Sequence, residues 1–175
     1  MIIDPAKLQT IPNSEDQTCF GCGAQNPHGL KMIFSTDGVR VYSFMQVPST
    51  MTGWDRTVHG GILSTMLDEI MGWSVIYLLK KIGMTQSITV QFNKAVNAGE
   101  RLTIVGGIQE KQSGRSALMQ AAIFNAAETL CVEATGNFTT MRPEAALRLG
   151  LVGQDYMKTF GPILTFKGAG KMTRL

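Results

Sequence analysis

The hydrophobic pattern of the chain changes its period at one place, between residues 60 and 77. On either side of this segment, apolar side chains recur at every second position, as they do in β-strands. Within it they recur at three- and four-residue spacing and form one face of a helix. That face consists of Leu63, Met66, Leu67, Ile70, Ser74 and Tyr77. One long helix among strands predicts an α+β fold, with an antiparallel sheet covering a central helix.

Turn signals divide the rest of the chain into short strands. The dipeptide Asp37-Gly38 separates two alternating segments and predicts a β-hairpin over residues 30–47. After the helix, alternation returns in four strands that short turns connect. They are expected near residues 88–92, 102–104, 117–123 and 130–134. Residues 48–56 are expected to form a loop, and a helical pattern from Pro143 to Leu151 precedes a Gly-rich tail that we expect to be loosely ordered.

The chain has the size of a single domain. Its 175 residues, 44% of them hydrophobic, suffice for one core. We expect residues 19–142 to form that domain, between an irregular N-terminal extension (1–18) and a C-terminal extension (143–175).

Composition excludes several classes of protein. The net charge is +3 and the basic residues are scattered, unlike those of a nucleic-acid binder. No apolar run approaches the roughly 20 residues of a membrane span, and the N-terminus has no hydrophobic block of the signal-peptide type. Three cysteines are too few for a disulfide scaffold. We therefore expect a cytoplasmic protein without a membrane or nucleic-acid partner.

The side of the helix opposite its apolar face carries mostly small residues around one carboxylate. This stripe consists of Gly61, Ser64, Thr65, Asp68, Gly72 and Val75. The N–H groups of Gly60 and Gly61 begin the helix, where the helix dipole favours an anion or a developing oxyanion. An ordinary alternative also fits, with Asp68 solvated on the outer face and His59 capping or packing at a plain loop-to-helix junction.

Three motifs in order resemble one enzyme family. The segment His59-Gly60-Gly61, followed by Asp68 and Gly72, resembles the helix signature of hotdog-fold acyl-CoA thioesterases of the PaaI-like branch. The segments Cys19-Phe20-Gly21-Cys22-Gly23 and Asn26-Pro27-His28-Gly29-Leu30 are similar to the N-terminal motif of one group in that branch. Residues 85–100 resemble the strand that follows the helix. The resemblance covers about residues 19–141.

The resemblance implies a role for each residue of the helix motif. Asp68 matches the catalytic acid, which acts as nucleophile or general base. The N–H of Gly60 matches the donor to the thioester carbonyl, and His59 is expected to shape that turn. Gly61 and Thr85 are expected to bind substrate, with Thr85 at the position of a hydroxyl that orients water in some relatives.

The resemblance also implies what the protein works with. Members hydrolyse acyl-CoA at sites between two subunits, so a homodimer or homotetramer is expected, with no cofactor beyond the CoA of the substrate. One position departs from the pattern, because Gly53 stands where some relatives have an Asn near the carbonyl or the water. Aromatic, medium-chain and short-chain acyl groups all fit the motif.

Cys19, Cys22 and His28 invite a zinc interpretation. A structural site takes four ligands, and the remaining cysteine, Cys131, lies in a predicted strand. A redox Cys-x-x-Cys pair usually opens a helix, whereas this one precedes a strand. We therefore expect no metal, and a small hydrophobic plug with Phe20 packed over the first hairpin.

Two other functions suit the same fold. A non-catalytic acyl-CoA-binding protein would not need a carboxylate beside the thioester, which Asp68 provides. A hotdog dehydratase carries a differently placed pair of His and acidic residues. The sequence therefore favours a thioester hydrolase, in which Glu69 ranks below Asp68 because it lies on another face of the helix.

Overall fold

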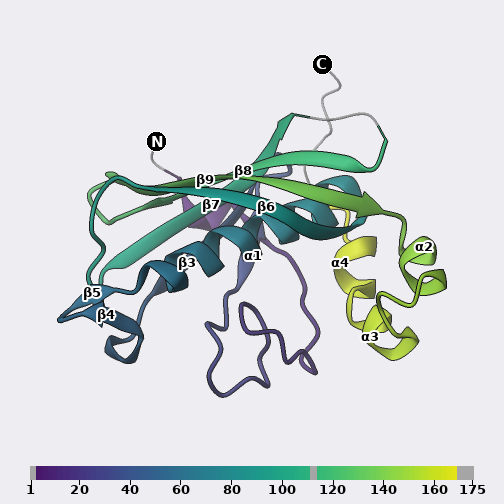
Figure 1. The fold of residues 1–175 in the computed structure, drawn as a ribbon, viewed down its shortest axis with the longest axis horizontal. Coiled ribbons are helices and arrows are strands. Elements are labelled where there is room, and N and C mark those ends of the chain that lie inside the picture. The colour runs from purple at the N-terminus through teal and green to yellow at the C-terminus, as the bar shows by residue number, and fades with distance from the viewer. Residues whose placement is uncertain (1–2, 111–113, 169–175) are drawn as a thin grey trace.

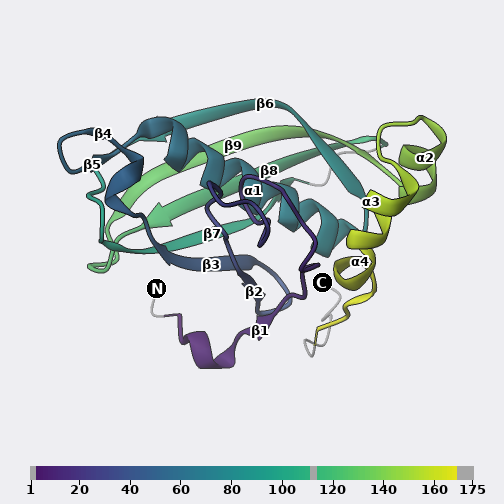
Figure 2. The same cartoon turned by 90° about the horizontal axis from the view of Figure 1, so that it is seen from below.

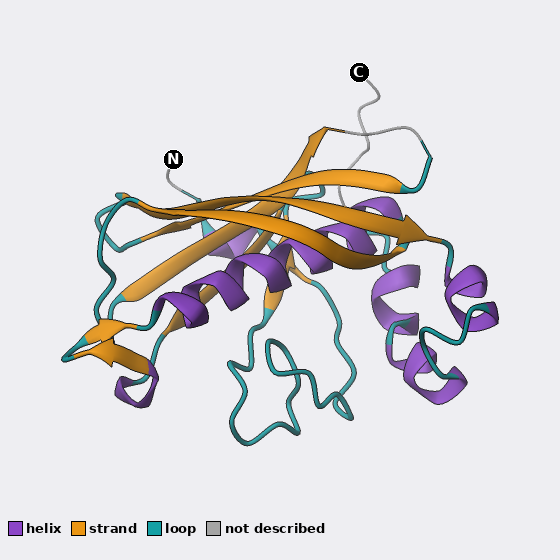
Figure 3. Cartoon of the chain, in the orientation of Figure 1, coloured by secondary structure: helices purple, strands orange, loops and turns teal. Residues whose placement is uncertain are grey.

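One curved antiparallel sheet wraps around one long helix in the computed structural model, which describes residues 3–110 and 114–168 (Figure 1). The sheet has seven strands in the order β1-β2-β3-β7-β8-β9-β6. They are β1 (Gln9–Thr10), β2 (Phe34–Thr36), β3 (Val41–Gln46), β7 (Arg101–Glu110), β8 (Ser116–Phe124), β9 (Leu130–Met141) and β6 (Ile82–Phe92). Helix α1 (Gly60–Leu79) lies against its inner face (Figure 3). The predicted α+β hotdog architecture is confirmed.

The core lies between α1 and the sheet. Every member of the predicted apolar face is buried, and so are Met71, Trp73 and Val75. Val75 was expected on the small-residue stripe, and its burial corrects that expectation. Strand β6 turns back over the end of the helix so closely that a Cβ at Gly83 would lie 2.7 Å from Val75 Cγ1. The helix itself ends earlier than Gly83, with Lys80 as a left-handed C-cap at φ 54°.

The predicted hairpin is present but shorter than expected. It consists of β2 and β3, joined at Asp37-Gly38 with Gly38 at φ 92°. The turn is held by Asp37, whose Oδ1 accepts from the N–H groups of Val39 and Arg40 at 2.8 and 2.7 Å. The expected loop over 48–56 contains a short 3₁₀ helix, η2 (Ser49–Met51), and the strand β4 (Thr52–Trp54), which pairs with β5 (Thr57–Val58).

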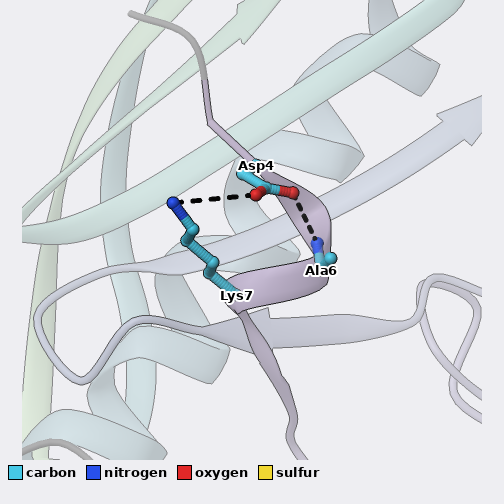
Figure 4. Close-up of polar contacts among 3 residues, drawn as sticks. All are labelled: Asp4, Ala6 and Lys7. Carbon is cyan, nitrogen blue, oxygen red and sulfur yellow. Dashed lines mark hydrogen bonds and ion pairs between the residues drawn. The ribbon is translucent and has the colours of Figure 1, made fainter.

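The N-terminal segment takes part in the fold rather than remaining irregular. Strand β1 pairs with β2 at the edge of the sheet, and Ile11 is buried in the core. Before it, the short 3₁₀ helix η1 (Pro5–Lys7) is capped by Asp4 (Figure 4). One oxygen of Asp4 accepts from Ala6 N at 3.1 Å, and the other lies 3.8 Å from Lys7 Nζ.

Three short helices follow the sheet and pack at the C-terminal end of α1 (Figure 2). They are α2 (Pro143–Arg148), α3 (Gln154–Thr159) and α4 (Gly161–Thr165). The expectation of a loosely ordered tail is wrong up to residue 168, and residues 169–175 lie outside the described part. Lys80 Nζ donates to the carbonyls of Ile163 and Phe166 at 3.2 and 2.6 Å. The Tyr77 and Phe166 rings lie 5.9 Å apart.

By length and composition alone, α1 is apolar enough to cross a membrane, although no uninterrupted apolar run in the sequence reaches that length. Half of the window that passes this test is buried inside the fold. A helix buried in a protein core also passes this test, because the side chains that pack against the sheet are apolar.

Candidate active site

Asp68 meets Thr85 where strand β6 passes beside α1. The Thr85 hydroxyl donates to Asp68 Oδ1 at 2.7 Å. Asp68 is half-buried, whereas Thr85 is exposed at the edge of the sheet. The pairing of β6 with β9 shifts register between Thr85 and Ser87, and such a bulge re-aims a side chain. The structure thus brings together two residues that lie 17 positions apart in sequence.

The small-residue stripe around Asp68 remains half-buried or exposed, apart from Val75. Ser64 and Thr65 donate their hydroxyl groups to the carbonyls of Gly60 and Gly61, each at 2.9 Å. Their hydroxyl donors are therefore used within the helix. Asp68 is left as the ionisable group of this face.

His59 sits at the N-cap of α1 and shapes its first turn. Its Nδ1 accepts from Gly61 N at 2.9 Å, so the N–H of Gly61 is already used. No described residue accepts from the N–H of Gly60, which is the first residue of the helix. His59 is held in turn by the Met51 carbonyl, which accepts from His59 N at 3.0 Å. Of the two predicted glycines, Gly60 has the available donor.

Gly53 lies directly against His59. A Cβ at this position would lie 3.1 Å from His59 Cδ2 and 3.3 Å from its Cα. The position that departs from the family pattern is therefore adjacent to the helix N-terminus, and its lack of a side chain leaves that space to the imidazole ring.

The N–H of Gly60 and the carboxylate of Asp68 lie at different positions along the axis of α1. Gly60 and Asp68 are eight residues apart, and a rise of about 1.5 Å per residue separates them by about 12 Å along the axis. A single carbonyl group cannot contact both within one chain, because each contact requires roughly 3 Å. The two elements can cooperate only if a second copy of the helix supplies one of them.

Hollows lie both at the N-terminus of α1 and over the sheet. A cavity of about 530 Å³ at the N-terminus of α1 is lined by both histidines of the chain. Its lining is Phe20, Pro27, His28, Thr50, Met51, Thr52, His59 and Ile62. A larger hollow of about 1200 Å³ lies over the sheet and contains none of the predicted site residues. The hydrogen-bonded carboxylate of Asp68 and the available N–H of Gly60 lie at α1 and not in this larger hollow.

The structure also assembles a cluster that the sequence analysis did not predict. Glu69 faces the N-terminal segment, with Cys19 Sγ at 3.6 and 3.5 Å from its two carboxylate oxygens and Cys22 nearby. Trp73 Nε1 donates to Glu69 Oε1 at 3.1 Å. Phe20, which we expected to pack over the first hairpin, is 43% exposed, and its carbonyl accepts from Leu30 N at 2.8 Å at the start of that segment. The four-residue spacing of Glu69 and Trp73, which puts both on one helix face, was the available signal.

Comparison with known proteins agrees with this architecture. Residues 56–132 match the family model of the thioesterase superfamily. The matched segment runs from just before β5 through α1, β6, β7 and β8 to the start of β9, and this part of the chain resembles the thioesterase superfamily. Among curated proteins, none matches the chain in sequence.

Solved structures of other hotdog domains are similar. A thioesterase superfamily protein is 23% identical with a TM-score of 0.64, over 70% of this chain and 60% of that one. A hypothetical thioesterase from Streptococcus pneumoniae TIGR4 with coenzyme A is 24% identical, TM-score 0.56, over 60% and 80%. The PaaI protein of the Escherichia coli phenylacetic acid degradation operon is 17% identical, TM-score 0.56, over 63% and 78%. The hotdog domain described here therefore shares its fold with thioesterases.

Proposed function

We propose that this protein is an acyl-CoA thioesterase, which hydrolyses the thioester to a free carboxylic acid and CoA. The observation that carries the proposal is the hydrogen bond between Thr85 and Asp68, on a helix whose first N–H, that of Gly60, has no acceptor among the described residues. The superfamily match supports it. So do the coenzyme A complex of the S. pneumoniae protein and the acetyl CoA complex of smu.793 from Streptococcus mutans UA159.

The hydrogen bond from Thr85 decides which oxygen of Asp68 is available for the reaction. Thr85 occupies Oδ1, which leaves Oδ2 for the reaction. As a general base, the carboxylate takes a proton from water, the hydroxide attacks the carbonyl carbon, and CoA leaves as the thiol. As a nucleophile, it forms an anhydride, expels CoA and is released by water. In both routes the N–H of Gly60 stabilises the oxyanion.

The same function requires two copies of the chain. In an antiparallel pair of helices related by a two-fold axis near Ser64, Gly60 of one copy lies opposite Asp68 of the other. The stripe of small residues allows that close approach. Strand β6 supports it too, because it pairs with β9 on one edge and with no other described strand on the opposite edge. The proposal is therefore a homodimer, or a homotetramer of two such pairs.

Two further parts of the proposal concern the cofactor and the cellular location. No cofactor is required, because a carboxylate, a hydroxyl and a main-chain N–H suffice for thioester hydrolysis. Cys19, Cys22 and Cys131 are free thiols, as is usual in the reducing cytoplasm, where we place the protein.

The test is thiol release from a panel of aromatic, medium-chain and short-chain acyl-CoA substrates, with the Asp68→Asn variant. Asn is nearly isosteric, so binding should persist while kcat falls about 10²–10⁴-fold, the usual contribution of a general base. Asp155→Asn is the matched control, since that carboxylate is exposed on α3. A variant at position 68 that kept more than about a tenth of kcat would favour the non-catalytic acyl-CoA binder over the enzyme.

A further inference from the structure

The long segment between β1 and β2 lies over the face of α1 that the sheet leaves uncovered (Figures 1 and 2). It brings Cys19 and Cys22 to Glu69, which follows Asp68 in the helix and points about 100° away from it. One ligand atom from each of the three residues lies within 4.8 Å of the other two. The proposed hydrolysis does not use these groups, although Cys22 belongs to the hydrophobic core and Cys19 packs against it.

The distances within the cluster match those that a tetrahedral zinc ion imposes. With bonds of about 2.3 Å to sulfur and 2.0 Å to oxygen, two such ligands lie about 3.5 Å apart. Cys19 Sγ lies 3.5 and 3.6 Å from the oxygens of Glu69. The cluster is thus close to the geometry of a bound ion without rearrangement of the backbone.

The backbone around the cluster is built for close approach. A Cβ at Gly21 would overlap the carboxyl group of Glu69, and a Cβ at Gly23 would overlap the main chain of Gln17 and Cys19. Glycine at both positions lets the loop fold tightly around the sulfur atoms. The turn is closed by Gly23 N, which donates to the Cys19 carbonyl at 2.9 Å.

The cluster contains an acidic side chain without a basic partner among the described residues. Within residues 3–110 and 114–168, no lysine or arginine forms an ion pair with Glu69. A divalent ion would supply the missing positive charge.

We propose that Cys19, Cys22 and Glu69 bind one transition-metal ion of the zinc class. Two thiolates select a borderline or soft ion over magnesium or calcium. Three protein ligands leave a fourth position for water. Trp73, which donates to Glu69 Oε1, orients the carboxylate as an outer-shell partner. The ion fastens the segment around Cys19 to the central helix. The expectation of no metal rested on cysteine and histidine alone, and the helix supplies the carboxylate.

The test uses the full-length, reduced protein. Elemental analysis of protein purified without chelator should give one zinc per chain. After removal of zinc with a chelator, titration with Co²⁺ should produce a thiolate-to-cobalt charge-transfer band that saturates at one equivalent. Zn²⁺ should abolish the band and raise the melting temperature of the metal-free protein.

Variants assign the ligands. Cys19→Ser and Glu69→Gln should each weaken Co²⁺ binding by more than about 100-fold, beyond the 10- to 100-fold loss expected for Trp73→Phe. Cys131→Ser is the matched control, because this buried cysteine lies in β9, and it should bind normally. The proposal is overturned if reduced wild-type protein gives no charge-transfer band, if the band survives in Cys19→Ser, or if a Cys19–Cys22 disulfide forms instead of stoichiometric metal binding.

Discussion

Replacing Gly60 with proline removes one hydrogen-bond donor and little else. Gly60 is the first residue of α1, where proline fits because this N–H has no acceptor inside a helix. His59 has φ −62° and ψ 133°, a conformation that a following proline accepts. The fold should therefore survive. Loss of one oxyanion donor should lower kcat about 10²–10³-fold, which corresponds to about 2.7–4 kcal/mol of transition-state stabilisation.

Gly60→Ala is the matched control for this prediction. It keeps the N–H, and its Cβ would lie 3.4 Å from the Phe92 ring, an ordinary contact. Thiol release under steady-state conditions measures both variants, and circular dichroism verifies the helix. If Gly60→Pro and Gly60→Ala had equal kcat values, the N–H of Gly60 would not stabilise the transition state.

The same variant tests whether the site spans two chains. In an equal mixture of Gly60→Pro and Asp68→Asn chains that pair at random, half of the dimers are mixed. A mixed two-fold dimer holds one site with both defects and one with neither, so about a quarter of wild-type activity should return. A site confined to one chain would show no recovery on co-expression.

Two other changes have predictable results. Thr85→Val removes the hydroxyl that donates to Asp68 at 2.7 Å. The value of kcat/KM should fall at least about tenfold, the lower bound for loss of a hydrogen bond to a charged group. Steady-state kinetics checks this, and the control Thr85→Ser should retain activity. Burial acts to raise the pKa of Asp37, but the N–H groups of Arg40 and Val39 outweigh it and lower that pKa. Asp37→Ala should therefore cost about 1–2 kcal/mol at pH 7, as other lost caps do. This cost should shrink as the pH falls below about 3.9 and through the lower folded pKa, because the folded carboxylate is then protonated. Urea unfolding at pH 7 and pH 3 measures the difference, and an equal cost at both would contradict it.

Local periodicity explains why the central elements could be predicted from sequence. The helical spacing from Leu63 to Tyr77 reports burial against one surface, and that surface is the sheet. The alternation in residues 117–123 likewise reports a strand with one buried face. Asp68 could be singled out because it interrupts a stripe of small residues, although the bond to Thr85 depends on how β6 is placed.

Contacts between distant segments could not be predicted in the same way. Nothing in the sequence distinguishes Glu69, because its partners Cys19 and Cys22 belong to a distant segment. Cys19 precedes it by 50 residues. Val75 was misplaced because β6 returns over it at Gly83, a close approach that a helical wheel does not contain. Helices α3 and α4 of the C-terminal segment were missed for a related reason. Helix α4 is too short to give a clear periodic pattern, and it contacts α1.

Lys80 links the C-terminal end of α1 to a segment that is synthesised much later. Its ammonium group holds two carbonyls that lie 83 and 86 residues further along the sequence. N-terminal segments become available for folding first during synthesis, so α1 and the early strands exist before those carbonyls do. A chain that stops short of residue 163 therefore lacks both acceptors of this ammonium group. A segment made long after α1 thus holds the C-terminal end of that helix.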